Sequence, residues 1–234
     1  MILAIILMVL GACSLTFFLI EKVKAYSVKA TIIKSVTSLL FIVLATYSAF
    51  TSGHHIFSMF AIPALVLGLL GDIWLDFKYV YPKEDKLYTY AGFIVFALGH
   101  ILYVTGMFLE FLPEGSNPLF IILPIIVGIA GGALTVLMEK PLKLEYKDMK
   151  LIVFIYACFL FTNPAVAMSL LINHSFESTS LILLFIGGVF FAISDLILSG
   201  TYFGGKERPF DIISNAITYY AAQYLIAFSI FFLI

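Results

Sequence analysis

The feature of this sequence that most constrains its fold is a series of eight apolar runs, most of them long enough to cross a lipid bilayer. A helix needs about 20 apolar residues to span about 30 Å of hydrocarbon, and only helices and closed barrels satisfy their backbone hydrogen bonds in lipid. The runs lack the alternation of barrel strands. We therefore predict an all-α membrane protein, a single domain over residues 1–234 whose helices lie near residues 2–20, 30–50, 56–77, 88–109, 118–138, 150–172, 179–200 and 211–234.

Composition excludes several other classes of protein. The chain is 62% hydrophobic and 12% charged, whereas soluble domains are about 45–50% apolar and about 25% charged. A net charge of -1 leaves no basic field for nucleic acid. Cys13 and Cys158 both lie in apolar runs, so we expect no disulfide framework. The first run is preceded by no basic residue, which favours a retained span over a cleaved signal peptide.

The distribution of positive charge predicts an orientation. The connections around residues 51–55, 110–117 and 173–179 contain no Lys or Arg. Because cytoplasmic connections carry the excess of basic residues, we expect the other four to be cytoplasmic and both termini to lie outside, in a multi-pass protein of the cell membrane. The 13 basic residues lie in or beside those four connections: Lys22, Lys24, Lys29, Lys34, Lys78, Lys83, Lys86, Lys140, Lys143, Lys147, Lys150, Lys206 and Arg208.

A weak internal repeat relates the two halves of the chain. Asp72 and Asp195 stand in similar five-residue segments, 71–75 and 194–198, and are 123 residues apart, as are His100 and Gln223. A four-helix unit duplicated in parallel would place the two acidic helices around an axis along the membrane normal. The low identity leaves both duplication and chance open.

Ionisable residues inside apolar spans are costly and mark functional sites by default. Asp72, Asp195 and His100 are the outstanding examples. From a rise of about 1.5 Å per residue, Asp72, Asp195 and Tyr219 lie within roughly 15 Å of the cytoplasmic surface, with Asn215 shallower and His100 and Gln223 deeper. The polar residues that accompany them toward this layer are Lys34, Tyr103, Tyr156, Asn215, Tyr219 and Gln223.

Other polar residues have simpler interpretations. Asp76 shares a helix face with Asp72, but its place beside the loop and Lys78 favours a helix-end charge with a cytoplasmic partner. His54, His55 and His174 fall in the opposite connections, where we expect solvated side chains.

Two carboxylates in one apolar pocket favour one ionised and one protonated group, which is an acid/base pair. Buried interhelical hydrogen bonds are the simpler alternative for the same residues. A single imidazole at this depth argues against multi-histidine zinc, and we predict no metal and no cofactor, although a site built from Asp72, His100 and Asp195 stays open.

The polar residues stand in four recognisable motifs. These are Gly71-Asp72 with Leu75, the GxxxFxxxHxxY pattern of Gly92, Phe96, His100 and Tyr103, the segment FFAISDLIL from Phe190 to Leu198, and YYAAQ from Tyr219 to Gln223 with Leu225-Ile226. On these motifs the sequence resembles the YhhN-like lysoplasmalogenase family over nearly its whole length. Ser35 after Lys34, where Pro is common, and Ser199 after Leu198 depart from the family pattern.

The resemblance implies an activity. Family members characterised as enzymes hydrolyse the vinyl-ether bond of lysoplasmalogens to a fatty aldehyde and a glycerophospho-base. We expect Asp72 and Asp195 to share the acid and base roles, with His100 orienting one of them or relaying protons. The partners would be a lysophospholipid substrate and membrane lipid, held by Lys34, Tyr103, Tyr156, Asn215, Tyr219 and Gln223.

Two other functions remain open from the sequence. A transporter or lipid-binding protein would use the same polar layer as a substrate site near the midplane. A metal-dependent amidase acting on ceramide-like lipids would use it as a ligand set.

Overall fold

The computed structural model describes residues 1–205 and 208–233, so Lys206 lies outside the described residues. The predicted all-helical fold and the count of eight long helices are confirmed, and no strand occurs in the described part of the chain. The helices are α1 (Ile2–Lys24), α2 (Val28–Ser52), α3 (Ile56–Val80), α4 (Asp85–Phe111), α5 (Leu119–Leu137), α6 (Lys150–Asn173), α7 (Thr179–Gly204) and α8 (Pro209–Ser229). Three single-turn helices, Pro82–Glu84, Lys147–Met149 and Ile230–Phe232, adjoin them.

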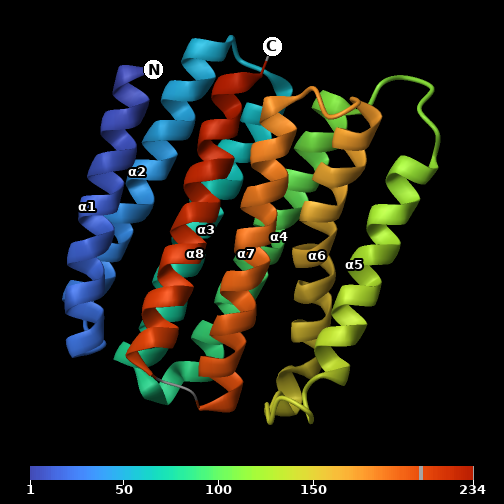
Figure 1. Ribbon diagram of the computed structural model, residues 1–234. Helices are drawn as coiled ribbons and strands as arrows, with labels where there is room; N and C mark the ends of the chain where they lie inside the picture. The colour runs from blue at the N-terminus through green and yellow to red at the C-terminus, as the bar shows by residue number, and fades with distance from the viewer. Residues whose placement is uncertain (206–207, 234) are drawn as a thin grey trace.

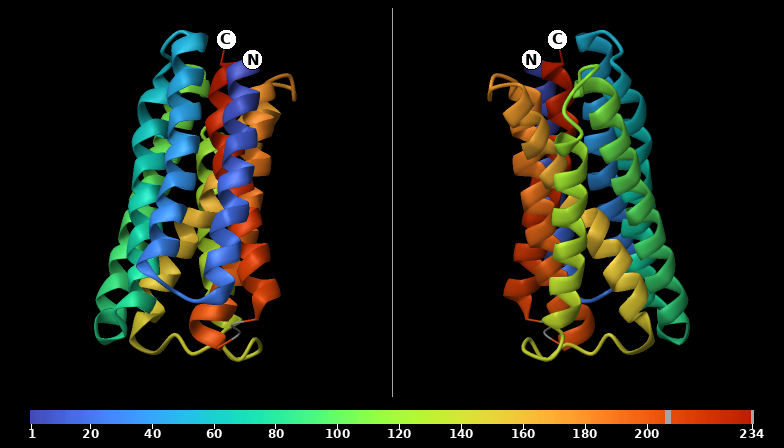
Figure 2. Two further views of the ribbon diagram at one scale, coloured as in Figure 1. Left: turned by 90° about the vertical axis from the view of Figure 1, so that its left-hand side faces the viewer. Right: turned by 90° about the vertical axis from the view of Figure 1, so that its right-hand side faces the viewer.

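The helices form an upright bundle in which consecutive helices run antiparallel (Figure 1). Both ends of the chain lie at the same end of the bundle, and α1 and α2 lie at one edge with α5 and α6 at the other. The connection between α5 and α6 crosses the end opposite the termini (Figure 2). Both termini share one end because the number of crossings is even.

Seven of these helices, α1 to α7, are long and apolar enough to cross a membrane. The remaining helix, α8, carries Asp211, Asn215, Tyr219 and Gln223 and packs against α7, α2, α1 and α3. Large apolar side chains cover the outer surface of the bundle, for example Ile122, Leu134 and Leu137 on α5. The chain is therefore a multi-pass membrane protein.

Glycines bring helices together where the site is built. A Cβ at Gly71 of α3 would overlap the ring of Phe96 on α4, and one at Gly92 of α4 would overlap Leu75 of α3. Gly128 of α5 packs in the same way against Thr162 and the Cys158 carbonyl of α6. Small residues let membrane helices approach this closely, so α3 and α4 form a tightly packed pair beside the pocket described below.

Several helix ends differ from the sequence prediction by a few residues, and two of these differences concern charged residues. The first helix continues to Lys24 instead of ending near residue 20, and it buries Lys22, which is 8% exposed. The third helix continues to Val80, which places Asp76 inside the bundle at 4% exposure. An apolar-run criterion ended the first helix before Glu21 and the third before Lys78, whereas Lys22 and Asp76 near these ends have partners within the bundle.

Candidate active site

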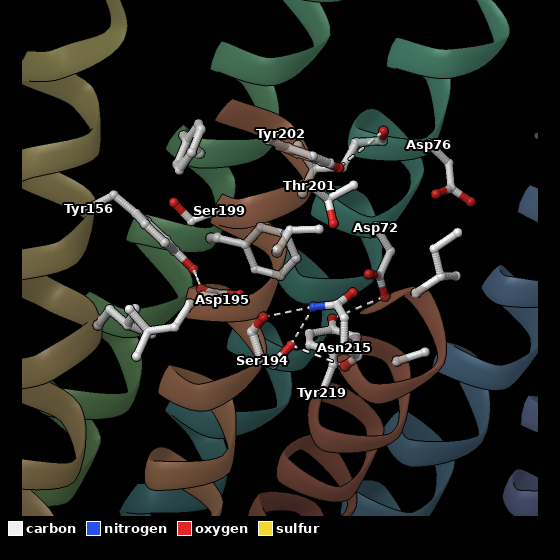
Figure 3. Close-up of a pocket in the computed structure, with 18 of the residues that line it drawn as sticks. Asp72, Asp76, Tyr156, Ser194, Asp195, Ser199, Thr201, Tyr202, Asn215 and Tyr219 are labelled. Atoms are coloured by element: carbon white, nitrogen blue, oxygen red, sulfur yellow. Dashed lines mark hydrogen bonds between the residues drawn. The ribbon is translucent and has the colours of Figure 1, made fainter. Parts of the chain in front are cut away.

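A pocket lies inside the half of the bundle opposite the chain termini and is lined by side chains from all eight helices. It encloses about 1220 Å³, its open mouth included. Figure 3 shows Asp72 and Asp195 on opposite sides of this pocket. Six of the predicted site residues line it: Lys34, Asp72, Tyr156, Asp195, Asn215 and Tyr219.

One side of the pocket holds a cluster of four charges, which we call the charged cluster: the buried Lys22, Asp72 and Asp76 and the half-buried Lys34. Lys22 Nζ lies 2.6 Å from Asp76 Oδ1, and Lys34 Nζ lies 3.3 Å from the same oxygen. Lys34 Nζ is also 3.2 Å from Asp72 Oδ1. Buried charges are tolerated when paired, and this cluster carries two positive and two negative groups when all four are ionised.

The Asp72 carboxylate is held by three donors from two helices, α2 and α8. In addition to Lys34, Ser38 of α2 donates to Oδ2 at 2.8 Å and Tyr219 of α8 donates to the same oxygen at 3.0 Å. An ionised carboxylate only accepts hydrogen bonds, and it is stabilised by charged and neutral donors alike. These three donors favour the ionised form of Asp72.

A chain of hydrogen bonds extends from Asp72 deeper into the bundle. Gln223 Nε2 donates to the Tyr219 hydroxyl at 2.9 Å, and the Tyr103 hydroxyl donates to Gln223 Oε1 at 3.3 Å. Because Tyr219 accepts from the amide of Gln223, its own hydrogen is free to point at Asp72. Gln223 and Tyr103 do not line the pocket, and they act on it through Tyr219.

Asp195 has different surroundings. Tyr156 of α6 donates a hydrogen bond to Asp195 Oδ2. No ion pair joins Asp195 to a basic residue, and its carboxylate has no second hydrogen-bond partner, among residues 1–205 and 208–233. Ser194, beside it in the chain, turns toward α8, where Asn215 Nδ2 donates to the Ser194 hydroxyl at 2.9 Å. Asp195 is thus partly exposed to the pocket without a counter-charge.

His100 is buried at 1% exposure but does not line the pocket. Its Nδ1 is 2.9 Å from Asn163 Nδ2 on α6, which donates to it, and its Nε2 has no hydrogen-bond partner within the described residues. The imidazole packs on the rings of Phe191 and Tyr156, with centroids 4.8 and 5.7 Å away. The structure therefore bonds His100 to neither aspartate.

The predicted alternative of a metal site built from Asp72, His100 and Asp195 lacks its geometry. Within the part of the chain that the structure describes, no three His, Cys, Asp or Glu side chains gather closely enough to hold a metal ion. The residues present do not fit such a ligand set.

Asp76 corrects the interpretation made from sequence. The sequence suggested a helix-end charge with a cytoplasmic partner, whereas Asp76 is buried and its nearest contact is Lys22, 54 residues away. Thr31 and Lys34 of α2 also donate to it. The sequence offered one signal for this arrangement, the shared helix face of Asp72 and Asp76, and no signal for Lys22, Ser38 or Asn163.

Two loop histidines also differ from expectation, because they join helix ends. His55 Nδ1 is 2.8 Å from Glu110 Oε1, while Glu110 Oε2 accepts the Phe57 N–H at 2.9 Å. His174 Nε2 lies 2.7 Å from the Phe111 carbonyl oxygen. These contacts fasten the end of the bundle remote from the pocket.

Comparison with known families matches the YhhN family model to residues 29–230. The chain belongs to the YhhN family. The YhhN match includes both aspartates, His100 and every predicted substrate contact, and it begins after Lys22. No curated protein and no solved structure matches the chain. The expectation drawn from the sequence motifs is thereby confirmed at the level of the YhhN family.

Proposed function

We propose that this protein is a lysoplasmalogenase, an integral membrane hydrolase that cleaves the vinyl-ether bond of lysoplasmalogen to a fatty aldehyde and a glycerophospho-base. The observation that carries the proposal is the pair Asp72 and Asp195, two carboxylates of unlike surroundings facing one pocket inside a membrane bundle. The resemblance of the sequence motifs to lysoplasmalogenases supplies the bond that they act on.

The reaction needs two groups of the kind that this pocket holds. Hydrolysis begins with protonation of the alkene carbon, which gives an oxocarbenium ion, and continues with addition of water to that ion. One carboxylic acid donates the proton, and one carboxylate stabilises the cation and activates water, as the paired carboxylates of glycosidases do. Asn215 and Tyr219 lie between the two aspartates, where they would hold the water or the glycerol hydroxyl.

The pocket also suits an amphiphilic substrate. Lys34 and Lys22 lie on one side, where ammonium groups would attract a phosphate. Apolar side chains of α6 and α7, such as Leu160 and Leu196, line the other side. With the basic connections in the cytoplasm, as the charge distribution predicts, the substrate would enter from the cytoplasmic leaflet of the cell membrane.

The proposal is tested with purified protein in detergent. Lysoplasmalogen and the matching acyl-lysophospholipid are incubated separately, and aldehyde is measured. We expect aldehyde from the vinyl ether alone, with turnover lowered on the order of 100-fold or more by Asp72→Asn or Asp195→Asn. Asp148→Asn, at the exposed surface, is the control and should retain full activity. Absence of aldehyde from well-folded protein would refute the proposal.

A transporter is the second candidate function. It would need the pocket to open toward the end that carries the chain termini. There the described contacts of His55 with Glu110 and of His174 with Phe111 tie helix ends together. Counterflow of labelled lysolipid across vesicles without aldehyde formation would favour transport over hydrolysis.

A further inference from the structure

The pocket is charged on one side and apolar on the other. Its charged cluster comes from α1, α2 and α3, and α1 and α2 lie at one edge of the bundle. Its opposite side is apolar and comes from α4, α6 and α7, with Phe93, Val153, Ala157, Leu160, Phe161 and Leu196 in its wall. Leu196 is 51% exposed on the outer surface, so this wall reaches the lipid-facing side of the bundle.

The two aspartates are placed along this direction. Asp72 belongs to the charged side through its contact with Lys34. Asp195 belongs to the apolar side, because Tyr156 holds it and the ring of Tyr156 packs on Phe93 at 5.1 Å between centroids. A lysophospholipid with its phosphate at the charged cluster and its chain along the apolar wall would therefore meet Asp72 first and Asp195 second.

The same two residues differ in what their carboxyl groups can do. Asp72 receives donors from Lys34, Ser38 and Tyr219, which together favour its charged form. Asp195 has one neutral donor, Tyr156, and no ion pair in the described ranges. A carboxylate in such a place is expensive, whereas a carboxylic acid is not.

From the polarity of the pocket and the partners of the two carboxyl groups we propose that Asp195 is the proton donor and Asp72 the ionised partner, an assignment that rests on the proposed function. In glycerol–O–CH=CH–R, the carbon that takes the proton is the one bonded to the chain R, and it therefore lies toward Asp195. The carbon that water attacks is bonded to the glycerol oxygen and lies toward Asp72. Polarity of the pocket and charge of the carboxyls thus give the same assignment.

The steps balance in protons. The alkene electron pair forms the new C–H bond as the O–H bond of Asp195 breaks, and a lone pair of the ether oxygen forms the C=O bond of the oxocarbenium ion at the carbon beside it. Water then forms a C–O bond to that carbon and gives a proton to Asp72. In the collapse of the hemiacetal, Asp72 returns this proton to the glycerol oxygen as its C–O bond breaks, and Asp195 takes the proton of the hydroxyl. Both residues end as they began.

A substrate-free experiment tests which carboxyl is protonated. Infrared spectra of purified protein at neutral pH are compared for the carbonyl stretching band of a protonated carboxyl group. We expect this band in the wild type and in Asp72→Asn and its loss in Asp195→Asn, with Asp148→Asn as the surface control. Its absence from the wild type, or its loss in Asp72→Asn with persistence in Asp195→Asn, would overturn the assignment.

A second pair of variants tests the same assignment if the aspartate variants do not fold. Tyr156→Phe removes the hydrogen bond to Asp195 and should shift the frequency of the band, whereas Ser38→Ala removes a donor to Asp72 and should leave it unchanged. The opposite pattern would overturn the assignment.

The pH dependence of kcat/KM gives the activity readout. Asp195→Asn should lose the fall at high pH that an essential acid causes, and Asp72→Asn should lose the fall at low pH that an essential base causes. Loss of the low-pH fall in Asp195→Asn and of the high-pH fall in Asp72→Asn would overturn the assignment of roles. If no aldehyde forms while the infrared bands behave as expected, the proposed function fails and the protonation of Asp195 stands.

Discussion

Replacement of Asp76 by Asn should destabilise the protein strongly, because it leaves Lys22 and Lys34 with one carboxylate. At 2.6 Å from Lys22, the charge of Asp76 contributes a direct attraction of about 6 kcal/mol at an effective dielectric constant of about 20. Relaxation and entry of water reduce this, and removal of one partner from a buried pair typically costs about 3–5 kcal/mol. For a chain of this size that loss corresponds to a fall in Tm of roughly 10 °C.

The matched control also removes the charge of Lys22, which Asp76→Asn leaves without its partner. In the double variant Lys22→Met/Asp76→Asn, Lys34 keeps Asp72 as its partner and the cluster is again neutral. Lys22 Nζ lies 5.9 and 4.2 Å from the ring centroids of Phe18 and Tyr26, so the unbranched side chain of Met would pack against aromatic rings. The double variant should therefore be more stable than Asp76→Asn alone, with a coupling energy of about 2–4 kcal/mol.

The assay is unfolding in detergent, followed by circular dichroism of the helices, for the wild type, both single variants and the double variant. Coupling below about 0.5 kcal/mol, the level at which independent substitutions simply add, would show that the Lys22–Asp76 contact carries no stability. The reasoning on buried charge in this bundle would then be wrong.

Three further outcomes are expected. In a background without Cys13 and Cys158, cysteines at positions 83 and 143 should be protected from impermeant thiol reagents in intact cells, while one at position 117 should be labelled; labelling at 143 would reverse the orientation. Gly128→Ala should cost about 1–3 kcal/mol, because the added methyl group overlaps Thr162 on α6, and unchanged unfolding would mean that α5 is not seated there. Exhaustive chelation should leave aldehyde formation intact, whereas loss of activity restored by zinc would favour the metal-dependent amidase mechanism.

The helices could be predicted from sequence because each one satisfies its backbone hydrogen bonds within its own segment. A run of apolar residues in lipid has to be helical wherever its neighbours lie, so residues 56–77 sufficed to predict α3. Depth could be predicted for the same reason, since rise along a helix is fixed. Lys34, Asp72 and Tyr219 were expected at one level, and their contacts confirm that they meet.

The direction in which each side chain points around its helix axis could not be predicted. This explains why the contacts of His100 and Lys22 were not foreseen. His100 was expected to orient one of the aspartates, but it turns toward Asn163 of α6 instead. Lys22 follows Glu21 and precedes Lys24, a pattern typical of a helix end, and only the approach of α3 shows that it has a buried partner. A single sequence contains no record of which faces meet.

The large sequence separation between Lys22 and Asp76 has a consequence for biogenesis. During synthesis α1 leaves the ribosome before α3, with the ammonium group of Lys22 at the end that the charge distribution predicts to be cytoplasmic. Its counter-charge is 54 residues further along the chain, so it is still untranslated when α1 enters the translocon. Until then, the flexible stem of Lys22 lets the ammonium group remain in the polar headgroup region. The Lys22–Asp76 ion pair can therefore form only after the third helix has been inserted, which makes this contact a late event in the assembly of the bundle.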